Sequence, residues 1–123
     1  MPYVHPTVLV VDDHDDERDG LTQLIRAEGY AVETARNGRE ALRVMRAVLP
    51  CIILLDLMMP DMSGYDFRQA QLADDEIEGI PVVIFSASHD VKEAAQRMDA
   101  AAYAEKPIQL KPLMALIRQH CLK

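Results

Sequence analysis

Basic charge is scarce in this chain of 123 residues, in which 13 Lys and Arg stand against 20 Asp and Glu for a formal net charge of −7. A protein that binds the phosphate backbone of nucleic acid needs a basic face. We therefore expect no nucleic-acid partner for this domain. The surplus of carboxylates instead suits a site that holds a divalent cation.

The sequence also lacks long apolar runs. None approaches the length of about 20 residues that a membrane-spanning helix requires. Residues 1–6 do not have the charged and then apolar layout of a signal peptide. We expect a cytoplasmic protein that has no membrane partner.

Cysteine is rare, since the chain has only Cys51 and Cys121. Cys51 falls inside an apolar run that we interpret as a core strand, and Cys121 lies near the C-terminus. Two such cysteines do not make a disulfide framework, so a reducing compartment is the better interpretation.

The remaining composition is that of an ordinary globular protein, with 50% hydrophobic and 27% charged residues. The length is sufficient for a hydrophobic core without disulfides or metal ions. The chain contains no linker, repeat or low-complexity segment, so we expect residues 1–123 to form a single domain.

Short apolar runs alternate with segments of helical periodicity along the whole chain. The strands are expected at residues 7–11, 30–35, 51–55, 80–85 and 101–106, and the helices near 15–28, 38–49, 64–72, 91–98 and 110–121. The run at 51–55 is unbroken, as in a strand buried on both faces of a parallel sheet. Alternating strands and helices predict a doubly wound α/β domain with helices on both faces of that sheet.

Polar side chains stand where four of these strands end. Asp12 and Asp13 follow the first strand, Asp56 the third, Ser86 the fourth and Lys106 the fifth. Taken singly, most of these have ordinary explanations as helix caps, turn residues or solvated charges. However, the carboxyl ends of parallel strands share one edge of the sheet, where open α/β folds bind their ligands. Together the five residues predict a cleft.

Such a cleft has a specific chemistry. Close carboxylates repel one another unless a cation lies between them, and Mg²⁺ prefers oxygen ligands from carboxylates, phosphate and water. With the cation bound, a carboxylate can attack a phosphoryl group and form an acyl phosphate. A lysine and a hydroxyl would then hold the phosphoryl oxygens.

Five short motifs occur in order along the chain: Asp12-Asp13, the segment from Asp56 to Gly64, Ser86-Ala87, Tyr103, and Lys106-Pro107. With these motifs the chain resembles, over nearly its full length, the CheY-like receiver domain of two-component response regulators. The resemblance implies a flavodoxin-like (βα)5 sandwich with a five-stranded parallel sheet of order 2-1-3-4-5.

The resemblance also implies roles for individual residues. Asp56 would be the phosphoacceptor. Mg²⁺ would be held by Asp12, Asp13, Asp56 and the backbone carbonyl of Met58.

Further residues would respond to the phosphoryl group. Ser86 and Lys106 would contact it, and the Lys106-Pro107 bond would be cis. Movement of Ser86 toward the phosphate would let Tyr103 turn inward and alter the surface formed by the fourth helix, fifth strand and fifth helix.

Partners follow from the same resemblance. The phosphoryl donor would be a sensor histidine kinase or a histidine phosphotransfer protein, and the output would act on a downstream effector protein. The domain would be a signalling switch and not an enzyme, catalysing only its own phosphorylation and dephosphorylation. We expect a monomer or a weak dimer.

Three other functions have weaker support in the sequence. A phosphatase with an aspartyl-phosphate intermediate usually has Asp-x-Asp after the first strand, whereas this chain has Asp12-Asp13-His14. A flavin carrier needs a phosphate loop rich in Ser, Thr or Gly at that position. A phosphorylation-independent adaptor with a receiver fold requires that Asp56 is never modified. His14 itself is expected to be a solvated residue of the first helical turn.

Overall fold

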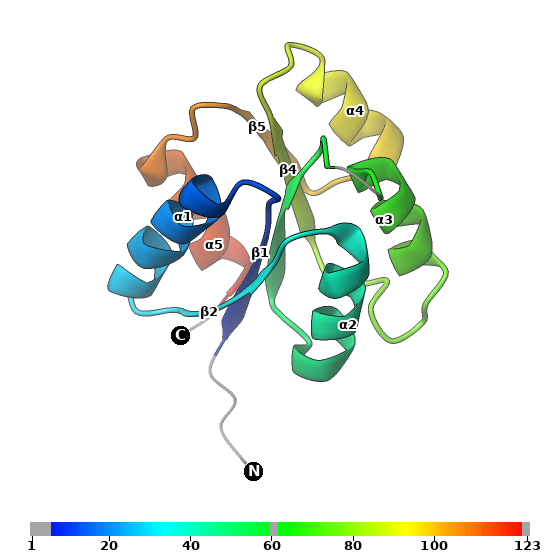
Figure 1. Cartoon of the computed structure of the whole chain (residues 1–123), viewed down its shortest axis with the longest axis horizontal. Helices are drawn as coiled ribbons and strands as arrows, with labels where there is room; N and C mark the ends of the chain where they lie inside the picture. Colours follow the sequence, from blue (N-terminus) through cyan, green and yellow to red (C-terminus); the bar gives the residue numbers. More distant parts are fainter. Residues whose placement is uncertain (1–5, 60–61, 122–123) are drawn as a thin grey trace.

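The computed structural model describes residues 6–59 and 62–121, in which strands and helices alternate (Figure 1). In chain order the elements are β1 (Thr7–Val11), α1 (Asp15–Ala27), β2 (Ala31–Ala35), α2 (Gly38–Val48), β3 (Ile52–Asp56), α3 (Gly64–Leu72), β4 (Val82–Ser86), α4 (Val91–Met98), β5 (Ala102–Glu105) and α5 (Leu110–His120). The expected order of strands and helices is confirmed.

All five strands form one parallel sheet in the order β2-β1-β3-β4-β5. In Figure 1, α1 and α5 cover one face of this sheet, and α2, α3 and α4 cover the other. Parallel strands need crossover connections, and the helices of these connections bury both faces. The predicted doubly wound, flavodoxin-like fold of order 2-1-3-4-5 is therefore confirmed.

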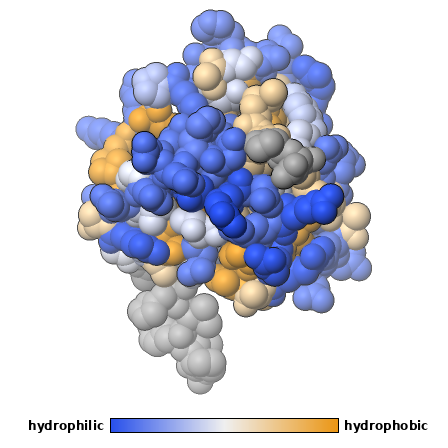
Figure 2. All heavy atoms as spheres, viewed as in Figure 1, coloured by the Kyte–Doolittle hydropathy of each residue, from blue (hydrophilic) through white to orange (hydrophobic). Residues whose placement is uncertain are grey.

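Burial is greatest in the middle of the sheet. Every residue of β3 and β4 is buried, whereas β2 and β5, the two edge strands, have exposed positions. One core cluster packs between the sheet and the three helices on its α2 side, and a second packs under α1 and α5. Figure 2 shows hydrophilic residues over the middle of the viewed face and smaller apolar patches toward its margins.

Local sequence explains where several elements begin and end. The side chain of Asn37 accepts a hydrogen bond from the Glu40 N–H at the start of α2, at 2.9 Å. Ser63 likewise caps α3, with Oγ accepting from the Asp66 N–H at 3.2 Å. α2 ends at Leu49, which adopts a left-handed conformation with φ of 52°. β4 begins two residues later than expected, after Pro81, which has no N–H to donate to a sheet.

The two cysteines are joined by a disulfide, and the expectation that they form no disulfide framework is wrong. Cys51 lies in the bend just before β3, and Cys121 directly follows α5. The packing of α5 on the sheet brings their Cα atoms to 5.4 Å, an ordinary distance for a disulfide. Their separation of 70 residues gave no local signal of this contact.

A buried arginine connects two helices on the α2 side of the sheet. Arg68 of α3 donates to the backbone carbonyls of Met98 and Asp99 at the end of α4, at 2.9 and 2.8 Å. It also donates to Gln71 Oε1 at 2.7 Å. The guanidinium thus ties the C-terminal end of α4 to α3.

In the part of the chain that the structure describes, no helix has the length and apolar composition needed to cross a membrane.

Candidate functional site

The sheet brings the five sequence-predicted polar residues to one edge. Asp56 is the last residue of β3 and Ser86 the last residue of β4, and these strands pair with Asp56 opposite Phe85. Asp12 directly follows β1, and Lys106 directly follows β5. In the sheet, β2 lies on one side of β1 and the later strands lie on the other, so the strand order reverses between β1 and β3. Ligands usually bind at this position in such sheets.

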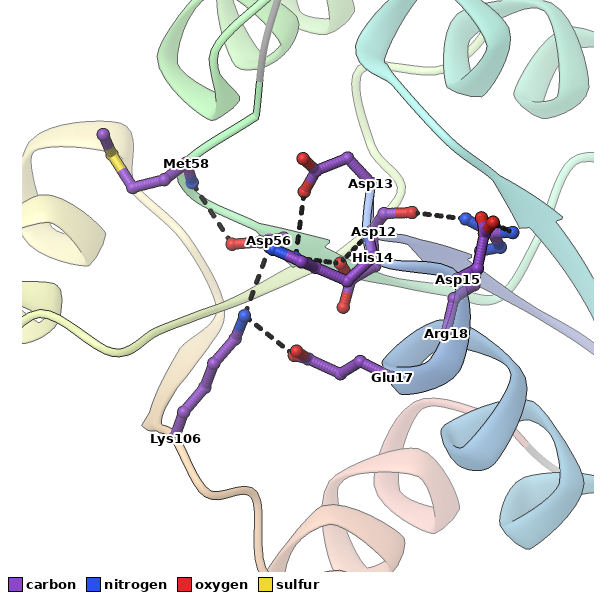
Figure 3. A network of polar contacts seen from close by, with 9 residues as sticks. All are labelled: Asp12, Asp13, His14, Asp15, Glu17, Arg18, Asp56, Met58 and Lys106. Carbon is purple, nitrogen blue, oxygen red and sulfur yellow. Dashed lines mark hydrogen bonds and ion pairs between the residues drawn. The ribbon is translucent and has the colours of Figure 1, made fainter.

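Asp56 lies at the bottom of the site and is only 2% exposed. Its Oδ1 accepts a hydrogen bond from the Met58 N–H at 3.2 Å, and its Oδ2 lies 3.4 Å from Lys106 Nζ (Figure 3). Burial raises the pKa of the Asp56 carboxyl, and the Lys106 ammonium opposes that rise. The Asp56 carboxylate thus faces the site, and the Lys106 ammonium is its positively charged neighbour.

Asp12 provides a buried acidic oxygen that lacks a partner. Asp12 is fully buried, and its Oδ2 has no hydrogen-bond partner among the described residues. Asp13 Oδ1 lies 3.2 Å from Nδ1 of the exposed His14. Burial raises the pKa of Asp12 to about 6, and the Asp56 carboxylate contributes to the rise. Buried carboxylate oxygens without partners are costly, and a bound cation removes that cost.

Four potential ligand atoms, from Asp12, Asp13, His14 and Asp56, lie within 4.8 Å of one another. Three of these residues supply carboxylate oxygens, the ligands that a hard cation such as Mg²⁺ prefers. This acidic cluster fits Mg²⁺ binding.

Lys106 forms two ion pairs. Its Nζ lies 2.7 Å from Glu17 Oε1 and 3.4 Å from Asp56 Oδ2, and it lies 5.3 Å from the centre of the Phe85 ring. Burial disfavours the charged ammonium, but Glu17 and Asp56 outweigh it and raise the pKa of Lys106. Burial likewise works against ionisation of Glu17, yet Lys106 lowers the pKa of that carboxyl.

The remaining predicted residues surround this centre. Ser86 is 2% exposed, and its Oγ accepts a hydrogen bond from the Ser88 N–H at 3.1 Å. Tyr103 is 44% exposed on β5, where it pairs opposite Ile84 of β4. Met58 is 66% exposed beside Asp56. The Lys106–Pro107 peptide bond is cis, and the motif residues at positions 60 and 61 lie outside the described residues.

Sequence reasoning missed one side chain of the site. Glu17 comes from the first turn of α1, where an acidic residue is ordinarily explained by the positive end of the helix dipole. His14 is exposed, as expected, and its Nδ1 lies 3.3 Å from Asp12 Oδ1 and 3.2 Å from Asp13 Oδ1. Asp13 and then Asp12 raise the pKa of this imidazole.

A positional signal could have identified Glu17. It lies in the first helical turn after the acidic pair, on the segment that leaves the predicted cleft (Figure 3). Residues so close to a site in sequence are candidates for contact with it.

Comparisons with known proteins identify the family of this chain. A family profile described as the response regulator receiver domain matches residues 8–118. The DNA-binding response regulator MtrA of Mycolicibacterium smegmatis is 33% identical over 120 residues, covering 96% of this chain and 51% of that protein. The chain therefore spans about half the length of this curated relative.

Solved structures agree. The chemotaxis protein CheY4 of Vibrio cholerae matches with a TM-score of 0.84 and 27% identity, covering 94% of this chain and 98% of that one. The response regulator TrrA of Thermotoga maritima, solved with Mg²⁺ and BeF, has the same fold, with a TM-score of 0.82 and 24% identity over 93% of this chain and 97% of that one. By the family match and the identity to MtrA, the chain belongs to the receiver domain family of response regulators.

Proposed function

We propose that this receiver is a phosphorylation-activated switch in which Asp56 accepts a phosphoryl group in a Mg²⁺-dependent reaction. Asp12, Asp13, Asp56 and the Met58 carbonyl hold the cation, and Lys106 and Ser86 contact the phosphoryl oxygens. Receiver domains of response regulators are signalling switches. We propose that the only reactions this one catalyses are its own phosphorylation and dephosphorylation.

One observation carries the proposal. The buried Asp56 carboxylate, the unpartnered Asp12 Oδ2 and the Lys106 ammonium meet at one edge of the sheet. An arrangement that served only stability would pair that buried oxygen. A cation and a phosphoryl group would instead give every charge a partner.

The proposed reaction is a phosphoryl transfer from a phosphohistidine. An oxygen of Asp56 attacks phosphorus, the bond from phosphorus to the donor's nitrogen breaks, and the leaving imidazole takes up a proton. Mg²⁺ held by Asp12, Asp13 and Asp56 would supply neutralisation of the negative charge in this reaction. Lys106 holds one phosphoryl oxygen, and the Ser86 hydroxyl, now bonded only to the backbone of the next turn, can donate to another.

The output is proposed to pass from Ser86 to Tyr103. Phosphorylation adds a strong acceptor that draws the Ser86 hydroxyl inward, and Tyr103 then turns from its exposed position. A hollow of about 810 Å³ beside Tyr103, between α4, β5 and α5, would change shape. We propose that a downstream effector protein binds this surface.

A second hollow supports a protein as phosphoryl donor. It has a volume of about 540 Å³, adjoins Lys106, and is lined by apolar side chains that include Leu21, Leu24 and Ile108. Leu24 is 47% exposed, so a protein that covered this hollow would bury apolar surface. A histidine kinase or histidine phosphotransfer protein that presents its phosphohistidine to Asp56 would contact this hollow.

Replacement of one hollow residue tests that contact. Leu24→Asp should slow phosphoryl transfer from a phosphohistidine protein by at least roughly tenfold, since it places a charge in an apolar interface. Transfer from acetyl phosphate should not change, because the variant leaves the acidic cluster intact. Equal slowing with both donors would show a structural defect, and no slowing with either would exclude the hollow as the contact surface.

Intact-protein mass spectrometry tests the phosphorylation itself. The chain is incubated with acetyl phosphate with and without Mg²⁺, alongside Asp56→Asn and the matched control Asp75→Asn, which changes an exposed carboxylate in a loop. We expect one added phosphoryl group in the wild type and the control, only with Mg²⁺, and none in Asp56→Asn. No adduct on the folded wild type would favour the phosphorylation-independent adaptor.

A further inference from the structure

The two ion pairs of Lys106 are unequal. Its ammonium lies 2.7 Å from Glu17 on α1 and 3.4 Å from Asp56 at the end of β3. In Figure 3 the Lys106 side chain enters from the lower left, and dashed lines join its nitrogen to Asp56 above and to Glu17 at the right. The nearer carboxylate belongs to the residue that has no role in the proposed phosphorylation.

The ion pair between Glu17 and Lys106 is partly buried. The side chain of Lys106 is 19% exposed and that of Glu17 is 35% exposed. Water therefore screens this pair less than it screens a surface pair. The flexible stem of Lys106 lets its compact ammonium shift between neighbouring anions, and it now lies closer to Glu17 than to Asp56.

A phosphoryl group on Asp56 changes the balance of charge. It adds a charge of roughly −1.5 to −2, and Lys106 is the proposed partner for that charge. As the ammonium moves toward the phosphoryl oxygens, the Glu17 carboxylate loses its cation. It is then left as an unpaired negative group near a strongly negative one.

We propose that Glu17 is a positioning residue that retains Lys106 in the unphosphorylated site and thereby disfavours the phosphorylated state. The inference rests on the proposed function, because it assigns Lys106 to the phosphoryl group. Glu17 thus lowers the occupancy of the phosphorylated form at a given supply of donor. Neutralising Glu17 should release Lys106 and strengthen binding of any phosphoryl-like anion at Asp56.

Beryllofluoride with Mg²⁺ is the probe, because it mimics a phosphoryl group on a carboxylate without turnover. Its affinity is measured by titration for the wild type, Glu17→Gln and Asp19→Asn. The last variant removes the same unit of charge from an exposed position of α1. We expect Glu17→Gln to bind roughly three- to tenfold more tightly than the wild type, and Asp19→Asn to bind within about twofold of it.

Equal or weaker binding by Glu17→Gln would overturn the inference. So would an equal gain in Asp19→Asn, because the effect would then be one of net charge. Neither result would affect the proposed function, provided that the wild type binds the probe and Asp56→Asn does not. A wild type that fails to bind the probe would overturn both.

A double-mutant cycle distinguishes competition for Lys106 from direct repulsion. In a Lys106→Met background, Glu17 has no ammonium to retain, so Glu17→Gln should give no further gain in affinity. A loss of stability alone would not produce this coupling. If Glu17→Gln tightens binding by the same factor in that background, Glu17 acts through its charge and the positioning role is wrong.

Discussion

The buried carboxyl of Asp12 should make the metal-free protein more stable in mild acid than at neutral pH. The pKa of Asp12 is raised by burial from 3.8 to about 6. A raised folded-state pKa gives stability that is fully present below the unfolded-state pKa. That stability is lost as the pH rises through the folded-state pKa. The loss therefore falls between about pH 4 and pH 6.

The magnitude follows from the shift. A change of about two pKa units in a group with no exposed surface corresponds to about 3 kcal/mol in the free energy of unfolding. The pKa of Asp56 is also raised, which adds a contribution of the same sign. Carboxylates with lowered pKa values, such as Glu17 and Asp74, contribute with the opposite sign. Asp12 must therefore be isolated by substitution.

Urea unfolding of the wild type and Asp12→Asn, from about pH 4.5 to pH 7.5 without metal, measures the effect. Near pH 4.5 the two proteins should have similar stability. At pH 7.5 the variant should be more stable by up to about 3 kcal/mol. Addition of Mg²⁺ at pH 7.5 should stabilise the wild type more than the variant. A stability difference that does not change with pH would refute the reasoning about Asp12.

Three other predictions concern stability. Reduction of the Cys51–Cys121 disulfide should lower the free energy of unfolding by roughly 4 kcal/mol, because the bond closes a long loop; urea titrations with and without reductant measure this, and an unchanged midpoint would contradict it. Leu49→Gly should raise the thermal midpoint, because glycine adopts the left-handed conformation of residue 49 without strain. The gain should be about 1 kcal/mol, and Leu49→Ala should not give it. Calorimetry of the two variants and the wild type measures the thermal midpoints. Arg68→Met should cost roughly 3 kcal/mol in urea unfolding, since it leaves buried acceptors without a donor; a cost below about 1 kcal/mol would show that water replaces the guanidinium.

Features that depend on short segments could be predicted from the sequence. The Ser63 cap, the turn at Asn37 and the unbroken strand that ends at Asp56 are local patterns, and the structure has all three. The convergence of polar residues followed from one further rule, that parallel strands end at the same edge.

Features that depend on how helices pack could not be predicted. The Cys51–Cys121 contact requires the position of α5 on the sheet. The contact of Glu17 with Lys106 requires the rotation of α1 about its axis relative to the loop after β5. Periodicity predicts which face of a helix is buried, but it does not predict which partner meets a charged residue at the border of that face.

The Arg68 contacts have a consequence for how α4 can move. The carbonyls at the C-terminal end of α4 are fastened to α3, whereas Asp90 at the other end makes no side-chain capping bond to the helix. Residues 87–90, which join that free end to Ser86, are exposed. A shift of Ser86 would therefore act on the end of α4 that α3 does not hold, and α4 would rotate about its C-terminal end at Met98 and not slide along the sheet. Because Val91 is buried in the core, such a rotation would also repack the side chains under the first turn of α4.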